Sequence, residues 1–325
     1  MAQESTEALV TVVIPLFNEE SIISAVIDRI SRIRSAHTKI QWLFVDDGSE
    51  DDSVRVLRAS ASRLSHWKIV TLANNAGQQQ AYRAGLAHAD GQAVIFLDAD
   101  LQDPPELIPE MIDRWRSGAM LVIPRRRSRK ERGHHRWKFA LFHWVFFHMT
   151  DGVMPRNTGT FGLMDRTIVD RLNAMQEYSV FLQALRCWVG HSPVFLWYDR
   201  EERMGGKAKQ NIQRLVRQGW DALTSFSETP LHMISYAGMI VSLLSGLYVI
   251  VLIAMKILQM FGYLQSLIVQ GFTTIAVAIS FLGGIQLIAI GILGEYIARI
   301  YLEVKRRPPY TVESISSSDA TNSAV

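Results

Sequence analysis

Three carboxylates, Asp98, Asp100 and Asp103, lie within six positions directly after the apolar run of residues 93–97. Such a run is typical of a buried parallel strand, and open α/β sheets bind ligands at the carboxyl ends of their strands. If the chain turns at the two prolines that follow, Asp98 and Asp100 could hold one divalent cation together with a phosphate ligand. The alternative is a simple strand-to-helix turn in which Asp103 caps the next helix.

The elements that must position these carboxylates alternate between strand and helix. Runs of β-formers predict strands, and apolar residues at a helical period predict helices. The expected strands are residues 9–14, 40–45, 68–72, 93–97 and 120–123, and the expected helices are 20–33, one ending at 64, 78–89 and 105–116. This alternation predicts an α/β fold with a mainly parallel sheet and helices on both faces. Polar pairs follow three strand ends, at residues 18–19, 46–47 and 98–100, and should converge on one edge of the sheet.

The apolar residues of the chain, 48% of the total, concentrate toward the C-terminus. No Asp, Glu, Lys or Arg lies between Glu228 and Lys256, or between Lys256 and Glu295. Because a bilayer-spanning helix needs about 20 apolar residues, we expect two transmembrane helices, near 233–255 and 266–293.

The distribution of charge predicts the orientation of these helices. Basic residues crowd residues 125–138 and 305–307, whereas the connection 261–265 has no charge, so the N-terminal part and the tail should face the cytoplasm. The net charge of +3 is too small to indicate nucleic acid as a partner. The start of the chain lacks the pattern of a signal peptide, and the single Cys187 excludes an internal disulfide, as expected in a reducing compartment.

Five segments together carry a family resemblance. They are IPLFNEE, VDDGS, NNAGQQQAYRAGL, LDADLQDPPELIPEM and, after two apolar segments, GILGEYIARIYLEVKRRPPY. In this order they resemble the family 2 glycosyltransferases that load sugars onto polyprenyl phosphates, such as dolichyl-phosphate mannose synthase and the bacterial undecaprenyl-phosphate glucosyl- and aminoarabinose transferases. The resemblance covers residues 10–310 and implies a hexosyltransferase with a GT-A (Rossmann-like) domain that takes a nucleotide sugar.

The resemblance also implies roles for particular residues. The nucleotide would contact Pro15, Phe17, Glu19, Asp47, Gln78 and Asp98. Mg²⁺ or Mn²⁺ would be held by Asp98, Asp100 and Gln102. The lipid phosphate would meet Arg126, Arg129 and Lys209, and Asp100, Asn157 and Arg203 would act in catalysis. For Asp46 and Asp47, the start of a helix is the alternative explanation, which could hold for one of the two.

Three departures from the family pattern bear on activity. Asn157 and Thr160 replace the two acids of a D-x-G-D-F-R-L segment, one of which is the usual candidate for a catalytic base. A phosphate monoester has a second pKa near about 6, so it can attack without a base. Ala208 replaces the serine of the R-x-x-G-x-S-K loop. Gln183, Arg186 and Trp188 resemble the Q-x-x-R-W signature of processive synthases, but one residue is inserted before the tryptophan.

The predicted organisation has three parts. Residues 1–229 form the cytoplasmic domain, with amphipathic interface helices near 136–149 and 212–226; a core helix is the alternative for the first. Residues 230–296 form the two transmembrane helices. Residues 297–325 form a cytoplasmic tail that we expect to be disordered from Glu313 onward.

The predicted function is the inverting transfer of one sugar, glucose from UDP-glucose, to undecaprenyl phosphate at the inner membrane. Its partners would be the nucleotide sugar, the polyprenyl phosphate and membrane lipids. Gly238, Ser242 and Gly246 form a small-residue stripe that, with the resemblance, suggests a homo-oligomer such as a tetramer. Two alternatives are a processive polysaccharide synthase and a degenerate membrane scaffold without activity.

Overall fold

The computed structural model describes residues 7–127, 155, 158–175, 177, 181–199, 229–261 and 272–318. The chain divides into two compact units, residues 1–219 with 307–325, and residues 220–306, which are described separately. The predicted interface helices 136–149 and 212–226, together with Arg129, Asn157, Arg203 and Lys209, lie outside the described residues.

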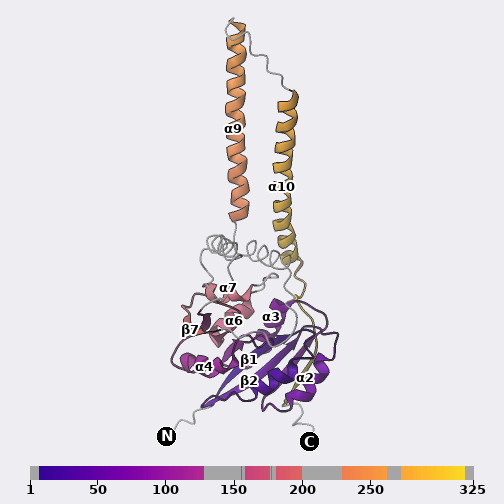
Figure 1. Cartoon of the computed structure of the whole chain (residues 1–325), viewed down its shortest axis with the longest axis vertical. Helices are drawn as coiled ribbons and strands as arrows, with labels where there is room; N and C mark the ends of the chain where they lie inside the picture. Colours follow the sequence, from indigo (N-terminus) through magenta and orange to yellow (C-terminus); the bar gives the residue numbers. More distant parts are fainter. Residues whose placement is uncertain are drawn as a thin grey trace. The chain divides into compact units, whose positions relative to one another are not determined.

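The first unit alternates strand and helix through most of its length (Figure 1). Its strands are β1 (Ala8–Leu16), β2 (Thr38–Asp46), β3 (Trp67–Leu72), β4 (Ala93–Phe96), β5 (Leu121–Arg126), β6 (Gly162–Asp165), β7 (Val194–Tyr198) and β8 (Val312–Ser317). Its helices are α1 (Ile23–Ile30), α2 (Ser53–Ala61), α3 (Gln78–His88), the 3₁₀ helix η1 (Pro105–Leu107), α4 (Ile108–Arg116), α6 (Arg166–Ala174) and α7 (Leu182–Trp188). The strands and helices predicted up to residue 123 are confirmed, with ends that differ by a few residues.

The eight strands form one sheet in the order β7-β5-β6-β4-β1-β2-β3-β8. The pairs β1–β2, β1–β4, β2–β3 and β5–β7 are parallel, whereas β6 and β8 run antiparallel to their neighbours. The prediction of a mostly parallel α/β sheet is confirmed. Because the chain passes outward from β1 to β3 and then returns to β4, the strand order reverses between β1 and β4. In open α/β sheets such a reversal opens a crevice at the carboxyl ends of the strands.

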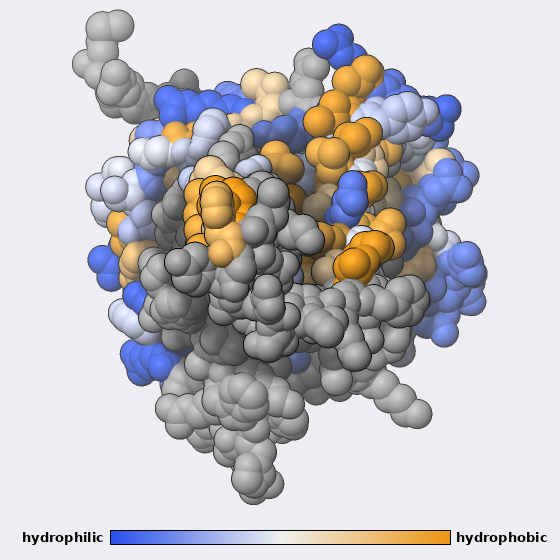
Figure 2. Space-filling model, turned by 90° about the horizontal axis from the view of Figure 1, so that it is seen from above, coloured by the Kyte–Doolittle hydropathy of each residue, from blue (hydrophilic) through white to orange (hydrophobic). Residues whose placement is uncertain are grey.

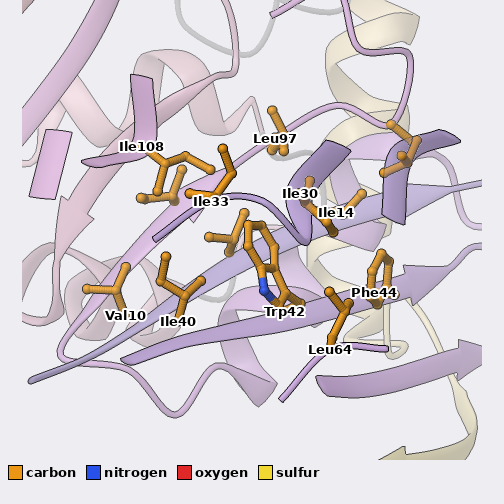
Figure 3. Close-up of a cluster of buried hydrophobic side chains, with 14 of the residues drawn as sticks. Val10, Ile14, Ile30, Ile33, Ile40, Trp42, Phe44, Leu64, Leu97 and Ile108 are labelled. Carbon is orange, nitrogen blue, oxygen red and sulfur yellow. The ribbon is translucent and has the colours of Figure 1, made fainter. Parts of the chain in front are cut away.

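The buried core explains why these residues form layers. On β2, Ile40, Trp42 and Phe44 alternate toward one face, where they join side chains of α1 such as Ile30 (Figure 3). On the other face Val13 of β1 meets α3 at Gly85, where an added Cβ would lie 2.2 Å from the Val13 Cγ1 atom. Helices therefore cover both faces, and the loops that follow β1 to β4 are left to gather at the sheet edge.

The second unit contains two long helices, α9 (Thr229–Met260) and α10 (Phe272–Lys305). Many of their apolar side chains are exposed, and Leu243 and Leu287 each expose 71%. Seen from above, the surface of the molecule carries orange hydrophobic residues beside blue hydrophilic ones (Figure 2). Within the described residues one stretch, Phe281–Lys305, is long and apolar enough to cross a membrane. The prediction of two transmembrane helices therefore stays a prediction.

The tail differs from its prediction. Residues Val312–Ser317 form β8, which pairs antiparallel with β3 from Lys68↔Ser317 to Leu72↔Val312. The expectation of disorder from Glu313 onward is wrong for this stretch. A segment rich in serine is typical of disordered chain, but the exposed edge of β3 supplies backbone partners that composition does not reveal.

Candidate active site

The loops after β1 and β2 are joined by backbone hydrogen bonds to polar side chains. Asn18 adopts a left-handed backbone conformation with φ of 52°, and its Oδ1 accepts from the Glu50 N–H at 2.9 Å. The Asn18 N–H donates to the Ser49 hydroxyl at 2.9 Å, and the Glu19 N–H donates to the Ser53 hydroxyl at 2.9 Å. This places the predicted nucleotide residue Glu19 beside the start of α2, and the predicted residues Pro15 and Phe17 lie at the end of β1 and just beyond it.

Asp47 joins the second loop to the third. Its Oδ1 accepts from the Ala76 N–H at 2.8 Å and its Oδ2 from the Gly77 N–H at 2.9 Å, directly before α3. Burial raises the pKa of Asp47, and these two backbone donors lower it. Asp47 thus holds the approach to α3. The alternative placed the Asp47 carboxylate at the start of α2, the helix that follows it in the chain. The observed bonds instead connect Asp47 to the residues before α3.

Asp98 lies two residues beyond the end of β4. Its Oδ1 accepts from the Gln78 amide at 2.7 Å and from the Tyr82 hydroxyl at 2.7 Å. Tyr82 is fully buried, and its ring centroid lies 4.3 Å from that of Phe96. Burial raises the pKa of Asp98 to about 6, the Tyr82 bond lowers it, and the charges of Asp100 and Asp103 raise it. A cation bound here would relieve this repulsion.

Asp100 lies in a tight turn that brings the next carboxylates back toward Asp98. The Gln102 N–H donates to the Asp100 Oδ1 at 3.1 Å, and Leu101 has a φ of 55°, which is uncommon for a leucine. Among the described residues no group of three or more His, Cys, Asp and Glu side chains is arranged as a metal site. The donor set of Asp98, Asp100 and the Gln102 amide nevertheless consists of hard oxygens, which suits Mg²⁺ or Mn²⁺ when a diphosphate supplies further ligands.

The alternative role of Asp103 as a helix cap is not seen at the N-cap position of η1, which is Pro104 and makes no side-chain cap hydrogen bond. Instead Asp103, 1% exposed, accepts from the Tyr198 hydroxyl and lies 3.6 Å from the Arg126 Nη2 atom. The Arg126 Nε–H also donates to the Tyr198 oxygen at 3.1 Å. Burial lowers the pKa of Arg126, but its Tyr198 bond and the charges of Asp103 and Asp98 outweigh burial and raise it. A cation is thereby held next to the carboxylates.

Arg186, part of the Q-x-x-R sequence on α7, is a buried arginine, with 1% exposure. It donates to the Thr160 carbonyl at 2.7 Å and to the Gly159 carbonyl at 2.6 Å, while the Gln183 amide donates to the Thr160 hydroxyl. Gln183 and Arg186 are three apart on one helical face, which explains the spacing. In this structure the pair holds a backbone segment.

Sequence reasoning missed three contributors: Tyr82, Tyr198 and the buried role of Asp103. For Tyr82 a signal existed, because it lies four residues after Gln78 and therefore on the same face of α3. For Tyr198 none existed, since its partner Asp103 is 95 residues away in the chain. Of the predicted site residues, Gln78 and Asp98 are brought into direct contact, and Arg126 is placed beside the carboxylate cluster.

Acidic and amide side chains thus converge at the point where strand order reverses, which is where open α/β sheets bind their ligands. The family model for glycosyl transferase family 2 matches residues 11–172. A glycosyltransferase of Synechocystis is 40% identical over 308 residues, which are 94% of this chain and 95% of that protein. The chain therefore belongs to glycosyl transferase family 2 and is a glycosyltransferase, as the motifs predicted.

Two further similarities complete the comparison. The bactoprenol glucosyl transferase of Shigella phage SfII is 36% identical over 308 residues, covering 94% of this chain and 97% of that protein. A solved structure of a mannosyltransferase from Pyrobaculum calidifontis is 19% identical with a TM-score of 0.49, covering 66% of this chain and 63% of that one.

Proposed function

We propose that this glycosyltransferase transfers a single glucose from UDP-glucose to undecaprenyl phosphate, with inversion at the anomeric carbon. The observation that carries the proposal is the juxtaposition of the Asp98, Asp100 and Asp103 carboxylates with the Arg126 guanidinium. The negative carboxylates suit a donor whose diphosphate carries a divalent metal, and the positive guanidinium suits an acceptor phosphate. The similarity to a bactoprenol glucosyl transferase over nearly the whole chain supports the choice of acceptor.

The donor side is assigned to the loops that the hydrogen bonds hold together. Pro15, Phe17 and Glu19 would contact the base and ribose, and Asp47 and Gln78 would complete the pocket from the second and third loops. Asp98, Asp100 and Gln102 would hold Mg²⁺ or Mn²⁺. When bound, the divalent ion screens the charge of the departing diphosphate.

The acceptor side is assigned to basic residues. Arg126 would hold the lipid phosphate, since a planar guanidinium presents several N–H donors to phosphate oxygens. Arg129 and Lys209 complete this proposal from outside the described residues. One phosphate oxygen attacks the anomeric carbon as the bond from that carbon to the diphosphate oxygen breaks, so the phosphate gains the sugar and UDP leaves. No base is required, because the acceptor is already ionised at neutral pH.

The remaining assignments concern Asn157, Arg203 and the membrane. Asn157 would orient the acceptor and Arg203 would contact the diphosphate; both join Asp100 in the proposed catalytic group. α9 and α10 would cross the inner membrane with the first unit on the cytoplasmic side, because basic residues flank them there. The protein would act as a homo-oligomer.

The experiment uses the full-length protein in membranes with radiolabelled nucleotide sugars and undecaprenyl phosphate. The expected product is one lipid-linked glucose, formed only with Mg²⁺ or Mn²⁺. Asp100→Ala should reduce transfer at least about 100-fold, as loss of a charge-stabilising group at a reacting centre does. Asp113→Ala, at an exposed position of α4, is the matched control. Full transfer by Asp100→Ala would refute the metal assignment, and a product ladder would favour the processive alternative.

A further inference from the structure

Gly159 lies between two arginines that come from different elements. On one side Arg186 donates to the carbonyls of Gly159 and Thr160 at 2.6 and 2.7 Å. On the other side an added Cβ at Gly159 would lie only 2.9 Å from the Arg126 Nη2 atom and 4.0 Å from the Asp103 Oδ2 atom. The missing side chain of Gly159 therefore leaves the space that the Arg126 guanidinium occupies.

The conformation of Gly159 does not explain the glycine by itself. Gly48, Gly77, Gly118, Gly162 and Gly190 are the glycines with positive φ in the described part of the chain, and Gly159 is not one of them. An alanine could adopt its backbone conformation without the penalty of the left-handed region. The close approach concerns the arginine side chain: an alanine at this position would bring its Cβ to 2.9 Å from the Arg126 Nη2 atom, so the guanidinium would have to shift.

Hydrogen-bonded side chains surround the space beside Gly159 that the Arg126 guanidinium occupies. Arg186 is fully buried, and its two carbonyl bonds fix the backbone of the Gly159–Thr160 segment from α7. Tyr198 on β7 accepts from the Arg126 Nε–H at 3.1 Å and donates to Asp103. Arg126 itself, with a side chain 14% exposed, thus lies against Tyr198 of β7, Asp103 of the loop after β4 and Gly159 of the segment before β6.

We propose that Gly159 is a positioning residue for the acceptor. Because it has no side chain, the Arg126 guanidinium can occupy the space beside it and bind the lipid phosphate from there. Gln183 and Arg186 keep this space free by fixing the backbone of residues 159–160. The inference rests on the proposed function for the role of Arg126. A guanidinium confined in this way loses less rotational freedom on binding phosphate than one free on the surface, so confinement strengthens binding. If Arg126 is displaced, its guanidinium keeps its charge but no longer has the orientation that binds the phosphate.

The test is a double-mutant cycle in the full-length protein with Gly159→Ala, Arg126→Ala and both together. Gly159→Ala should raise KM for undecaprenyl phosphate about five- to tenfold, within the range of coupling between contacting residues, and leave KM for the nucleotide sugar within about twofold. In the Arg126→Ala background the same change should have no further effect on lipid KM. A purely structural role would lower Tm and raise both KM values in both backgrounds.

A second variant keeps the test decisive if Gly159→Ala folds poorly. Gln183→Ala removes the amide that donates to the Thr160 hydroxyl and should weaken the acceptor in the same, Arg126-dependent way. Additive effects of Gly159→Ala and Arg126→Ala on lipid KM would overturn the inference and leave the proposed function intact.

Binding separates the two proposals when transfer is absent. If the wild type binds undecaprenyl phosphate, measured by tryptophan fluorescence, but transfers no glucose, the proposed function fails, and the cycle on dissociation constants decides the inference. If the wild type neither binds nor uses this lipid phosphate, both proposals are overturned.

Discussion

Replacing Tyr82 by phenylalanine tests the electrostatics of the crevice with the loss of one oxygen. The Tyr82 hydroxyl donates to Asp98 at 2.7 Å from a fully buried ring. A hydrogen bond to a charged group contributes about 1.5–3 kcal/mol, and about 1.4 kcal/mol corresponds to one pKa unit. Because this bond stabilises the ionised carboxylate, its loss should raise the Asp98 pKa from about 6 by roughly one to two units. At pH 7 about half or more of Asp98 would then carry a proton.

The assay is calorimetric binding of UDP with Mn²⁺ across pH 5–9, which does not involve the acceptor. Metal and proton compete for the same carboxylate, so affinity should fall on the acid side with a midpoint that follows the Asp98 pKa. The midpoint should move upward by about one to two units in Tyr82→Phe. Tyr198→Phe removes a similar hydroxyl whose acceptor is Asp103 and should leave the midpoint near the wild-type value. An unchanged or lowered midpoint in Tyr82→Phe would refute this account of Asp98.

Three further changes have expected outcomes. The folded pKa of Asp98 is raised from 3.8 to about 6, so the folded protein binds this proton more tightly than the unfolded chain does. The unfolding free energy of the metal-free protein should therefore fall by about 1–3 kcal/mol as the pH rises from 4 to 6. Denaturant titrations of Asp98→Asn should not show this decrease. Removing residues 311–325 should lower Tm by about 5–10 °C through lost β3–β8 hydrogen bonds, whereas removing 319–325 should not. Gly48→Ala adds a Cβ 2.7 Å from the Asn74 carbonyl carbon at a φ of +68° and should cost about 1–3 kcal/mol in chemical denaturation. Its control, Gly190→Ala at a φ of +96° with no atom within 4 Å, should cost less.

Local patterns were sufficient to predict the scaffold of the site. The helical period in residues 20–33 and the apolar run at 93–97 predicted α1 and β4, because burial on one face of a helix or both faces of a strand determines the spacing of apolar residues. The convergence of Asn18, Asp47 and Asp98 followed from the topology, since parallel strands end at the same edge. The hydrogen bonds through Asp47 and Gln78 confirm this convergence.

The contacts that tune the site could not be predicted in the same way. Asp103 stands directly before Pro104, where a capping role is the local expectation, yet its partners Arg126 and Tyr198 come from β5 and β7. A long-range contact of a buried carboxylate leaves no periodic trace in the sequence. Arg186 shows the same limit: its spacing from Gln183 was visible, but its carbonyl partners at Gly159 and Thr160 depend on how α7 packs near β6.

The tail lines a cavity at the edge of the sheet, which bears on how the protein is made. Glu313 and Ser314 of β8 line this cavity of about 670 Å³ together with Asp46, the last residue of β2, and Gly48 and Ser49 of the loop that follows. These tail residues follow α10 in the chain, so they are synthesised after both long helices. The edge of β3 therefore stays without its partner strand until the helices are complete. A fragment that ends before α9 keeps Asp98, Asp100 and Arg126 but lacks one wall of this cavity and the strand that covers β3.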